Sequence, residues 1–208
     1  MGTEEIEFRS DVTVELVRHS ASDADVLFAA RVSTQGEQTL TAASSGQAAG
    51  ERDRGLINYL MRDRHGSPFE HNSLTYYVQA PIFVFREFMR HRIASYNEES
   101  GRYRELRPVF YVPGPERKLI QVGKPGAYDF EDGTPEQTAL VQSEIKEVCR
   151  SAYESYQRML QAGVAREVAR AVLPVTLYSS MYVTMNSRSV MNFLSLRTKR
   201  EGSHFPSF

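Results

Sequence analysis

The chain interleaves strand-type and helix-type periodicities in an irregular order, and this feature constrains its fold most. Apolar residues alternate over Val12–Leu16 and over Leu74–Ala80, as they do in half-buried strands. Helical spacing marks residues 51–64 and a long amphipathic stretch whose apolar stripe is Val141, Ile145, Val148, Ala152, Tyr156 and Met159. No segment repeats, so the pattern predicts an α+β fold, in a single domain over residues 1–208.

Shorter signals give the remaining elements. We expect a helix capped by Ser22 or Asp23, a helix over 81–91 that places Arg86 and Arg90 on one face, an extended segment over 108–113, a helix carrying Arg166 and Arg170, a strand over 176–185, and a last helix capped by Asn186 or Ser187. Residues 35–50 and 114–135 are rich in turn-forming residues, and we expect mobile loops there.

Composition excludes some classes of function. The net charge of −1 gives no bulk attraction to nucleic acid or to a membrane surface. The single cysteine, Cys149, cannot form an internal disulfide, which favours a reducing cytoplasmic location. The chain shows no apolar run near the roughly 20 residues of a membrane helix.

Residues 90–103 concentrate arginine, histidine, serine and glutamate in one short stretch. Arginine presents a planar fork of donors that matches phosphate oxygens. The chain contains neither a G-x-G-x-x-G nor a G-x-x-x-x-G-K-[ST] motif, so a nucleotide's phosphates would have to be held by side chains. The alternatives are an ordinary charged surface loop and an RNA-binding loop with interleaved tyrosines.

The other reactive residues give weaker signals. His65 and His71 bracket a polar turn that could face a ligand, but no H-E-x-x-H motif or cysteine partner supports a metal site there. Cys149 lies within the long amphipathic stretch and fits a packed thiol. No G-x-S-x-G elbow is present, so covalent serine chemistry has no local support.

Four blocks of sequence together resemble the flavin-dependent thymidylate synthases. The family signature is Arg-His-Arg, seven residues, then Ser, and here it reads Arg90-His91-Arg92 followed by Ser100. The other matching blocks are His65–His71, Arg166–Pro174 and Asn186–Arg197. The resemblance spans about residues 55–197.

This resemblance implies a central, mostly antiparallel twisted sheet flanked by helices, in a homotetramer whose active sites are shared between subunits. It implies conversion of dUMP to dTMP, with methylenetetrahydrofolate as the one-carbon donor and FADH2, regenerated by NADPH, as the hydride donor. It implies FAD as cofactor and no nucleic-acid or membrane partner.

The resemblance also assigns residues by motif match. The implied FAD contacts are Ser33, Ser67, Glu70, Arg90, His91, Arg92, Asn97, Asn186, Arg188 and Asn192. The implied dUMP contacts are Glu87, Glu98, Glu99, Ser100, Gly101, Arg102, Arg170 and Arg197. Arg197 faces the uracil ring and is assigned with His65 to catalysis, and His65 and Tyr103 lie near the flavin and folate. Ser100 is expected to bind, because no base beside it would activate it as a nucleophile.

The chain departs from the family pattern at several positions. Glu87, Ser180 and Val183 replace residues that the family usually carries there, and the usual run after Arg197 is absent. We therefore expect either a trimmed or a short C-terminus, and we keep open a degenerate relative that binds flavin without methylating.

Overall fold

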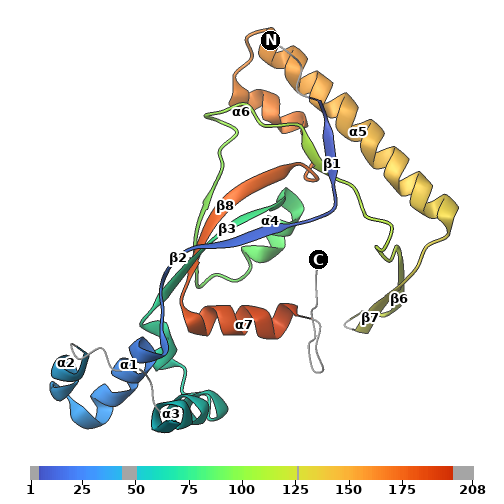
Figure 1. Cartoon of the computed structure of the whole chain (residues 1–208). Coiled ribbons are helices and arrows are strands. Elements are labelled where there is room, and N and C mark those ends of the chain that lie inside the picture. Colours follow the sequence, from blue (N-terminus) through green and yellow to red (C-terminus); the bar gives the residue numbers. More distant parts are fainter. Residues whose placement is uncertain (1–4, 44–50, 126, 199–208) are drawn as a thin grey trace. The chain divides into compact units, whose positions relative to one another are not determined.

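The computed structural model describes residues 5–43, 51–125 and 127–198. Its elements follow in the order β1 (Glu7–Arg9), β2 (Thr13–Ser20), α1 (Asp23–Gln35), α2 (Gln38–Ala43), α3 (Glu51–Arg62), η1 (Ser67–Glu70), β3 (Ser73–Pro81), α4 (Ile82–Phe88), β4 (Ser95–Glu98), β5 (Val109–Tyr111), β6 (Ile120–Lys124), β7 (Ala127–Glu131), α5 (Pro135–Gln161), α6 (Arg166–Ala169), η2 (Arg170–Val172), β8 (Tyr178–Met185) and α7 (Ser187–Arg197) (Figure 1). The expected α+β fold is confirmed.

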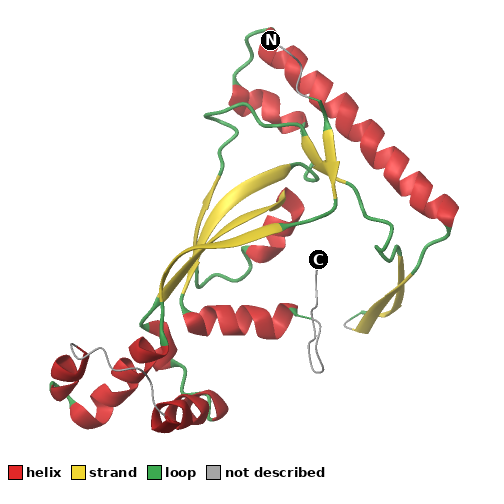
Figure 2. Ribbon diagram, viewed as in Figure 1, coloured by secondary structure: helices red, strands yellow, loops and turns green. Residues whose placement is uncertain are grey.

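Three sheets carry the strands (Figure 2). The four-stranded sheet has the order β2-β3-β8-β4, while β1 pairs in parallel with β5, and β6 pairs with β7 as an antiparallel hairpin. The neighbours β3 and β8 are separated by about a hundred residues in the chain, and Thr75 and Thr184 share a side-chain hydrogen bond of 2.9 Å between them. None of the helices in the described ranges has the length and apolar character needed to cross a bilayer.

Residue contacts divide the chain into two compact units. Unit 1 comprises residues 1–13, 78–90 and 98–181, and unit 2 comprises residues 14–77, 91–97 and 182–208. The strands β3 and β8 each contribute one half to each unit. The single domain expected from the sequence stays a prediction.

The core of unit 1 lies between the long helix α5 and the strand β5. Tyr153 and Tyr156 of α5 pack with Phe110, and both the Tyr156 ring and the Phe110 ring are fully buried. The two tyrosine hydroxyls bind the backbone of Leu106: Tyr156 accepts from its N–H at 3.2 Å and Tyr153 donates to its carbonyl at 3.4 Å. The helix begins in a capping box formed by Thr134 and Gln137.

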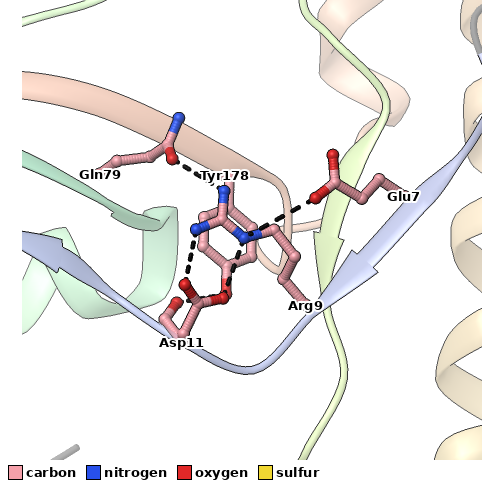
Figure 3. Close-up of polar contacts among 5 residues, drawn as sticks. All are labelled: Glu7, Arg9, Asp11, Gln79 and Tyr178. Carbon is pink, nitrogen blue, oxygen red and sulfur yellow. Dashed lines mark hydrogen bonds and ion pairs between the residues drawn. The ribbon is translucent and has the colours of Figure 1, made fainter.

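A second cluster in unit 1 fastens the segment after β1 (Figure 3). The Arg9 guanidinium binds the Asp11 carboxylate through two nitrogens at 2.8 and 2.9 Å, and it donates to the Gln79 side chain at 2.9 Å. It also lies 5.1 Å from the centre of the Tyr178 ring. The Tyr178 hydroxyl donates to the Asp11 carbonyl at 2.7 Å. These contacts link the segment after β1 to β3 and to the first residue of β8.

The core of unit 2 joins its helices to the turn η1. Val26 of α1, Leu60 of α3 and Phe69 of η1 are buried together, with Met191 of α7 packed against them. An ion pair between Arg31 and Asp53 adds a polar link between α1 and α3. Ser22, one of the two expected alternatives, caps α1, and the helix runs to Gln35.

Several expected elements are wrong in detail. Residues 38–43 form the helix α2, where a loop was expected, and buried Thr39 supports it by donating to the Gly36 carbonyl. Residues 44–50 of that expected loop lie outside the described ranges. The other expected loop contains the β6–β7 hairpin, because Ile120 and Val122 alternate with polar residues in a segment that was read for its glycines and prolines.

Two helices also differ from expectation. The helix α4 ends at Phe88, so Arg90 lies beyond it and does not share its face with Arg86; the Arg90 N–H binds the Glu87 carbonyl in the turn that follows. In α5, Val148 is exposed and Cys149 takes its place in the core. The buried positions Cys149, Tyr153 and Tyr156 follow the i, i+4, i+7 spacing of one helix face, which the neighbouring Val148 does not share.

Candidate functional site

The serine that completes the sequence signature opens a tight turn in unit 1. Its backbone carbonyl accepts from the N–H of Tyr103 at 3.0 Å, and its hydroxyl accepts from the N–H of Arg102 at 3.3 Å. Ser100 follows Glu99, whose N–H binds the Ser180 carbonyl of β8 at 2.8 Å. The turn is therefore anchored to a strand, which gives its side chains a defined direction.

Gly101 lies at a place where an added side chain would displace Leu106. A Cβ added there would lie 2.8 Å from Leu106 Cδ1 and 3.3 Å from Arg170 Cδ. The turn and the η2 residue Arg170 therefore approach each other closely, which brings two of the predicted dUMP-binding positions together. Arg102 beside them pairs with Glu167 of α6 at 3.1 Å and is half exposed.

The other predicted dUMP contacts in unit 1 are less closely grouped. Glu99 is half-buried and pairs with Arg104 at 3.0 Å. Glu87 on α4, Glu98 at the end of β4, and Tyr103 are exposed. Arg102 lies over the Tyr103 ring, 5.8 Å from its centre. This part of unit 1 is rich in arginine donors, because residues 102–107 include Arg102, Arg104 and Arg107.

In unit 2, the turn η1 meets the last helix. Arg188 in the first turn of α7 forms an ion pair with Glu70 of η1. Its side chain lies across Gly66, where an added Cβ would come within 2.7 Å of Nε. Three residues of two predicted FAD-binding blocks are thus in direct contact, although more than a hundred positions separate them in the chain.

Two asparagines fix the start of α7. Asn186 caps the helix and accepts from the N–H of Ser189 at 2.9 Å, whereas the N–H of Ser187 donates to Asn72 Oδ1 at 2.8 Å. Asn72 Nδ2 is buried and has no hydrogen-bond partner among the described residues. Sequence reasoning missed Asn72; its position directly after the His65–His71 block and before a strand was the available signal.

His91 and Arg197 are joined in unit 2 by a hydrogen bond. Arg197 Nε donates to His91 Nε2 at 3.0 Å, and the imidazole meets the Phe193 ring edge-on with 4.8 Å between centres. The Tyr96 hydroxyl donates to the His91 carbonyl at 2.6 Å. Burial, and next the charge of Arg197, lower the pKa of His91 below its usual value.

The remaining predicted residues are spread over unit 2, apart from Arg90, which belongs to unit 1. His65 stacks on Tyr59 at 5.7 Å, while Ser33, Ser67, Arg92, Asn97 and Asn192 are exposed. The described residues contain no group of three His, Cys, Asp or Glu side chains placed to hold a metal ion. Cys149 is buried beside Thr176, and its burial raises the pKa of the thiol.

The comparisons with known proteins agree with this grouping of motifs. A family model described as thymidylate synthase complementing protein matches residues 15–204. A flavin-dependent thymidylate synthase of Streptomyces coelicolor is 67% identical over 204 residues, which is 98% of this chain and 82% of the relative. The chain belongs to this family. A flavin-dependent thymidylate synthase of Tropheryma whipplei is 61% identical over 201 residues, covering 97% of this chain and 82% of that protein.

A solved structure is similar over nearly the whole chain. The crystal structure of a UMP/dUMP methylase, PolB, from Streptomyces cacaoi bound with 5-Br dUMP has a TM-score of 0.86 and 53% sequence identity, and covers 96% of this chain and 86% of that one. The family membership confirms the resemblance inferred from the sequence and argues against the RNA-binding alternative.

The residues present fit a flavin dinucleotide. Unit 2 offers the guanidinium of Arg188 over Gly66 and the buried amide nitrogen of Asn72, which has no hydrogen-bond partner among the described residues. Such donors suit the acceptor-rich diphosphate and ring system of FAD. All the predicted FAD positions except Arg90 lie in unit 2, and all the predicted dUMP positions except Arg197 lie in unit 1.

Proposed function

We propose that this chain converts dUMP to dTMP, taking a methylene group from methylenetetrahydrofolate and using FAD with NADPH as the reductant. The observation that carries the proposal is the similarity, at 53% identity over 96% of the chain, to a methylase solved with a brominated dUMP. The 67% identity to a flavin-dependent thymidylate synthase supports FAD as the cofactor. When bound, the flavin supplies the hydride that completes the methyl group.

The turn Ser100–Arg102 and Arg170 hold the dUMP phosphate. A phosphate dianion needs several donors fixed before it arrives, because each donor ordered on binding costs conformational entropy. The anchoring of Glu99 to Ser180 and the close approach of Gly101 to Arg170 support this role. The exposed carboxylates Glu87 and Glu98 accept hydrogen bonds from the sugar side of the nucleotide.

Arg197 stabilises negative charge that develops on the uracil ring as the ring is activated for methylation. A fixed cation beside a developing charge lowers the barrier without covalent chemistry. His65, stacked on Tyr59, lies near the flavin and folate with Tyr103. The residues that hold FAD are Ser33, Ser67, Glu70, Arg90, His91, Arg92, Asn97, Asn186, Arg188 and Asn192.

No protein nucleophile takes part. Cys149 is 1% exposed, and burial raises its pKa, so it offers little thiolate. Ser100 uses its hydroxyl to accept from the N–H of Arg102. Replacing Cys149 with alanine therefore leaves methylation intact.

The experiment that tests the function combines a spectrum with a turnover assay. We expect purified protein to show flavin absorption and to release tritium from 5-tritiated dUMP when methylenetetrahydrofolate, NADPH and FAD are supplied. Protein that binds flavin but releases no tritium would instead favour the degenerate relative. Protein that neither binds FAD nor releases tritium would overturn the proposal.

UMP is a second candidate substrate. The same methylase was also solved with 5-Br UMP, at a TM-score of 0.84 and 51% identity to this chain. The curated relatives at higher identity are named for thymidylate synthesis, so we propose dUMP as the preferred substrate. Tritium release from 5-tritiated UMP at a kcat/KM equal to or above that for dUMP would reverse this preference.

We further propose a homotetramer in the cytoplasm. The edge strand β2 exposes the aliphatic side chains Val14 at 60% and Leu16 at 50%, which alternate onto one face of the strand. Exposed apolar rows of this kind are usually covered by a partner. We expect Val14→Lys with Leu16→Lys to lower the molar mass measured by light scattering, whereas Glu15→Lys, between them, leaves it unchanged. A tetramer that survives the double substitution would show that β2 is not the interface.

A further inference from the structure

His91 and Arg197 have separate assignments in the proposed function, one to the flavin and one to the uracil ring, yet they touch. Arg197 Nε donates to His91 Nε2 over 3.0 Å. An imidazole nitrogen accepts a hydrogen bond only when it carries no proton, so His91 is neutral in this arrangement and its proton is on Nδ1. The pair therefore fixes both the charge and the tautomer of His91.

Two residues without any assigned role hold the imidazole. Phe193, one turn before Arg197 on α7, meets it edge-on at 4.8 Å between ring centres. Tyr96 of β4 donates to the His91 carbonyl at 2.6 Å and so fixes the backbone from which the ring projects. Both supports belong to unit 2, as do His91 and Arg197.

We propose that His91 is a positioning residue for Arg197, and that Phe193 and Tyr96 hold its neutral ring so that the guanidinium is aimed before the nucleotide binds. A guanidinium on a long side chain samples many rotamers, and ordering it in advance removes that cost from the reaction. The direction in which it is aimed, toward uracil, rests on the proposed function; the pair itself does not.

Charges around the ring favour the same state. Arg197 is the charged group that acts on His91 from α7, the adjacent Arg92 is exposed, and Tyr96 is the titratable residue that reaches it from β4. Protonation of His91 would turn the acceptor into a donor and place two cations face to face. The pair is therefore made above the pKa of His91 and is broken as the pH falls through it.

If His91 positions Arg197, variants that loosen the pair should lower kcat while leaving KM for dUMP nearly unchanged. The proposed phosphate holders, Ser100–Arg102 and Arg170, lie in unit 1, whereas His91 and Arg197 lie in unit 2. Loosening Arg197 should lower kcat for dUMP on the order of tenfold, since small misplacements of a catalytic group are costly. The KM for dUMP should change by less than about twofold, because the phosphate contacts remain.

The test follows the ionisation of His91 by NMR of protein with ¹³C-labelled histidine, assigned with a His91→Gln variant. We expect its midpoint to lie below the usual value in the parent protein and to rise in Phe193→Leu, which reduces the burial of the ring, and in Arg197→Met, which removes the neighbouring charge and its hydrogen bond. It should also rise in Tyr96→Phe, because the backbone of His91 loses its hydrogen bond and the ring is held less firmly in its buried position. Phe130→Leu and Tyr128→Phe, in the hairpin of unit 1, are the matched controls and should leave it unchanged. Turnover should then fall at a higher pH in Phe193→Leu and Tyr96→Phe than in the controls.

The outcomes separate this inference from the proposed function. Equal midpoints in the variants and the controls would overturn the positioning role, even in an enzyme that releases tritium. Shifted midpoints in a protein that releases no tritium would support the pair and refute the proposed reaction. Melting followed by circular dichroism identifies any variant that fails to fold, and Tyr96→Phe, which removes one hydroxyl only, then carries the test.

Discussion

At the scale of single residues, two glycines allow side chains from distant parts of the chain to lie directly against the backbone of predicted binding loops. Gly66 has an ordinary helical backbone with φ of −79°, so any residue could adopt its conformation. Its side-chain space is nevertheless occupied by Arg188, just as the space at Gly101 is occupied by Leu106 and Arg170. Each glycine therefore allows contact between a loop and an arginine side chain, and a motif of polar residues does not reveal such a contact by itself.

Gly66→Ala should weaken FAD retention. The new Cβ would lie 2.7 Å from Arg188 Nε, so the guanidinium must move from its place beside Glu70. A hydrogen bond to a charged group contributes about 1.5–3 kcal/mol, which corresponds to a loss of affinity of roughly ten- to a hundredfold. The flavin dissociation constant, measured by fluorescence quenching, checks this.

Gly55→Ala is the matched control for that substitution. Gly55 lies inside α3, and a Cβ added there meets no atom within 4 Å. Alanine in a helix interior is favoured over glycine by roughly 0.5–1 kcal/mol, so this variant should melt slightly higher and bind FAD normally. Equal flavin affinity in the two variants would show that Arg188 does not hold the cofactor.

At the scale of elements, one of the two alternative caps expected for the first helix and for the last helix is confirmed, whereas the end of α4 and the buried face of α5 were predicted wrongly. Ser22, Thr134 and Asn186 all cap helices through their side chains, because a short polar side chain can reach the first unpaired N–H groups of the same helix. Which face of α5 is buried was misjudged at Val148, since burial depends on what β5 and Leu106 present to the helix.

Tyr156→Phe should destabilise the protein through a backbone group that it leaves unpaired. The Tyr156 hydroxyl accepts from the Leu106 N–H at 3.2 Å in the buried core of unit 1. An unpaired buried donor costs about 1–3 kcal/mol, which lowers the Tm by roughly 2–4 °C for each kcal/mol in a chain of this size. Calorimetry on this variant, with exposed Tyr128→Phe as control, provides the measurement; equal melting temperatures would show that Leu106 finds another partner.

At the scale of the whole molecule, each unit gathers the positions expected for one ligand. Unit 2 holds nearly all of the FAD positions, and unit 1 nearly all of the dUMP positions. The signature stretch 90–103 contributes to both: residues 91–97 belong to unit 2, whereas Arg90 and residues 98–103 belong to unit 1. Of its three arginines, Arg92 lies in unit 2, whereas Arg90 and Arg102 lie in unit 1. The ligand roles that the motif match assigns to them stay predictions.

The stability of the whole molecule should decline in alkali through Tyr178. Burial raises the pKa of Tyr178 to about 12, with the Asp11 carboxylate as the next cause. In the unfolded chain the phenol ionises near its usual pKa of about 10, so unfolding releases a proton between these values. The contribution of Tyr178 is then complete below about pH 10 and is lost as the pH rises toward 12.

Tyr178→Phe removes the ionisable hydroxyl, and with it both the pH-dependent stabilisation and the hydrogen bond to the Asp11 carbonyl. We expect the variant to be less stable at pH 8 by about 1 kcal/mol, and the difference from the parent protein to shrink as the pH rises from about 10 to 12. Urea unfolding across this range is the measurement, and Tyr128→Phe corrects for ordinary exposed tyrosine. A difference that stays constant with pH would contradict the raised pKa.

The sequence by itself determined the α+β class, a pair of candidate caps for each of two helices and the four motif blocks that identify the family. These are local properties: periodicity, capping and the order of polar residues along the chain. Only the tertiary structure decided that Arg188 crosses Gly66, that Gly101 meets Arg170 and that Arg197 donates to His91. Such contacts join residues up to 122 positions apart, and they depend on how β3, β8 and α7 pack, which no local pattern encodes.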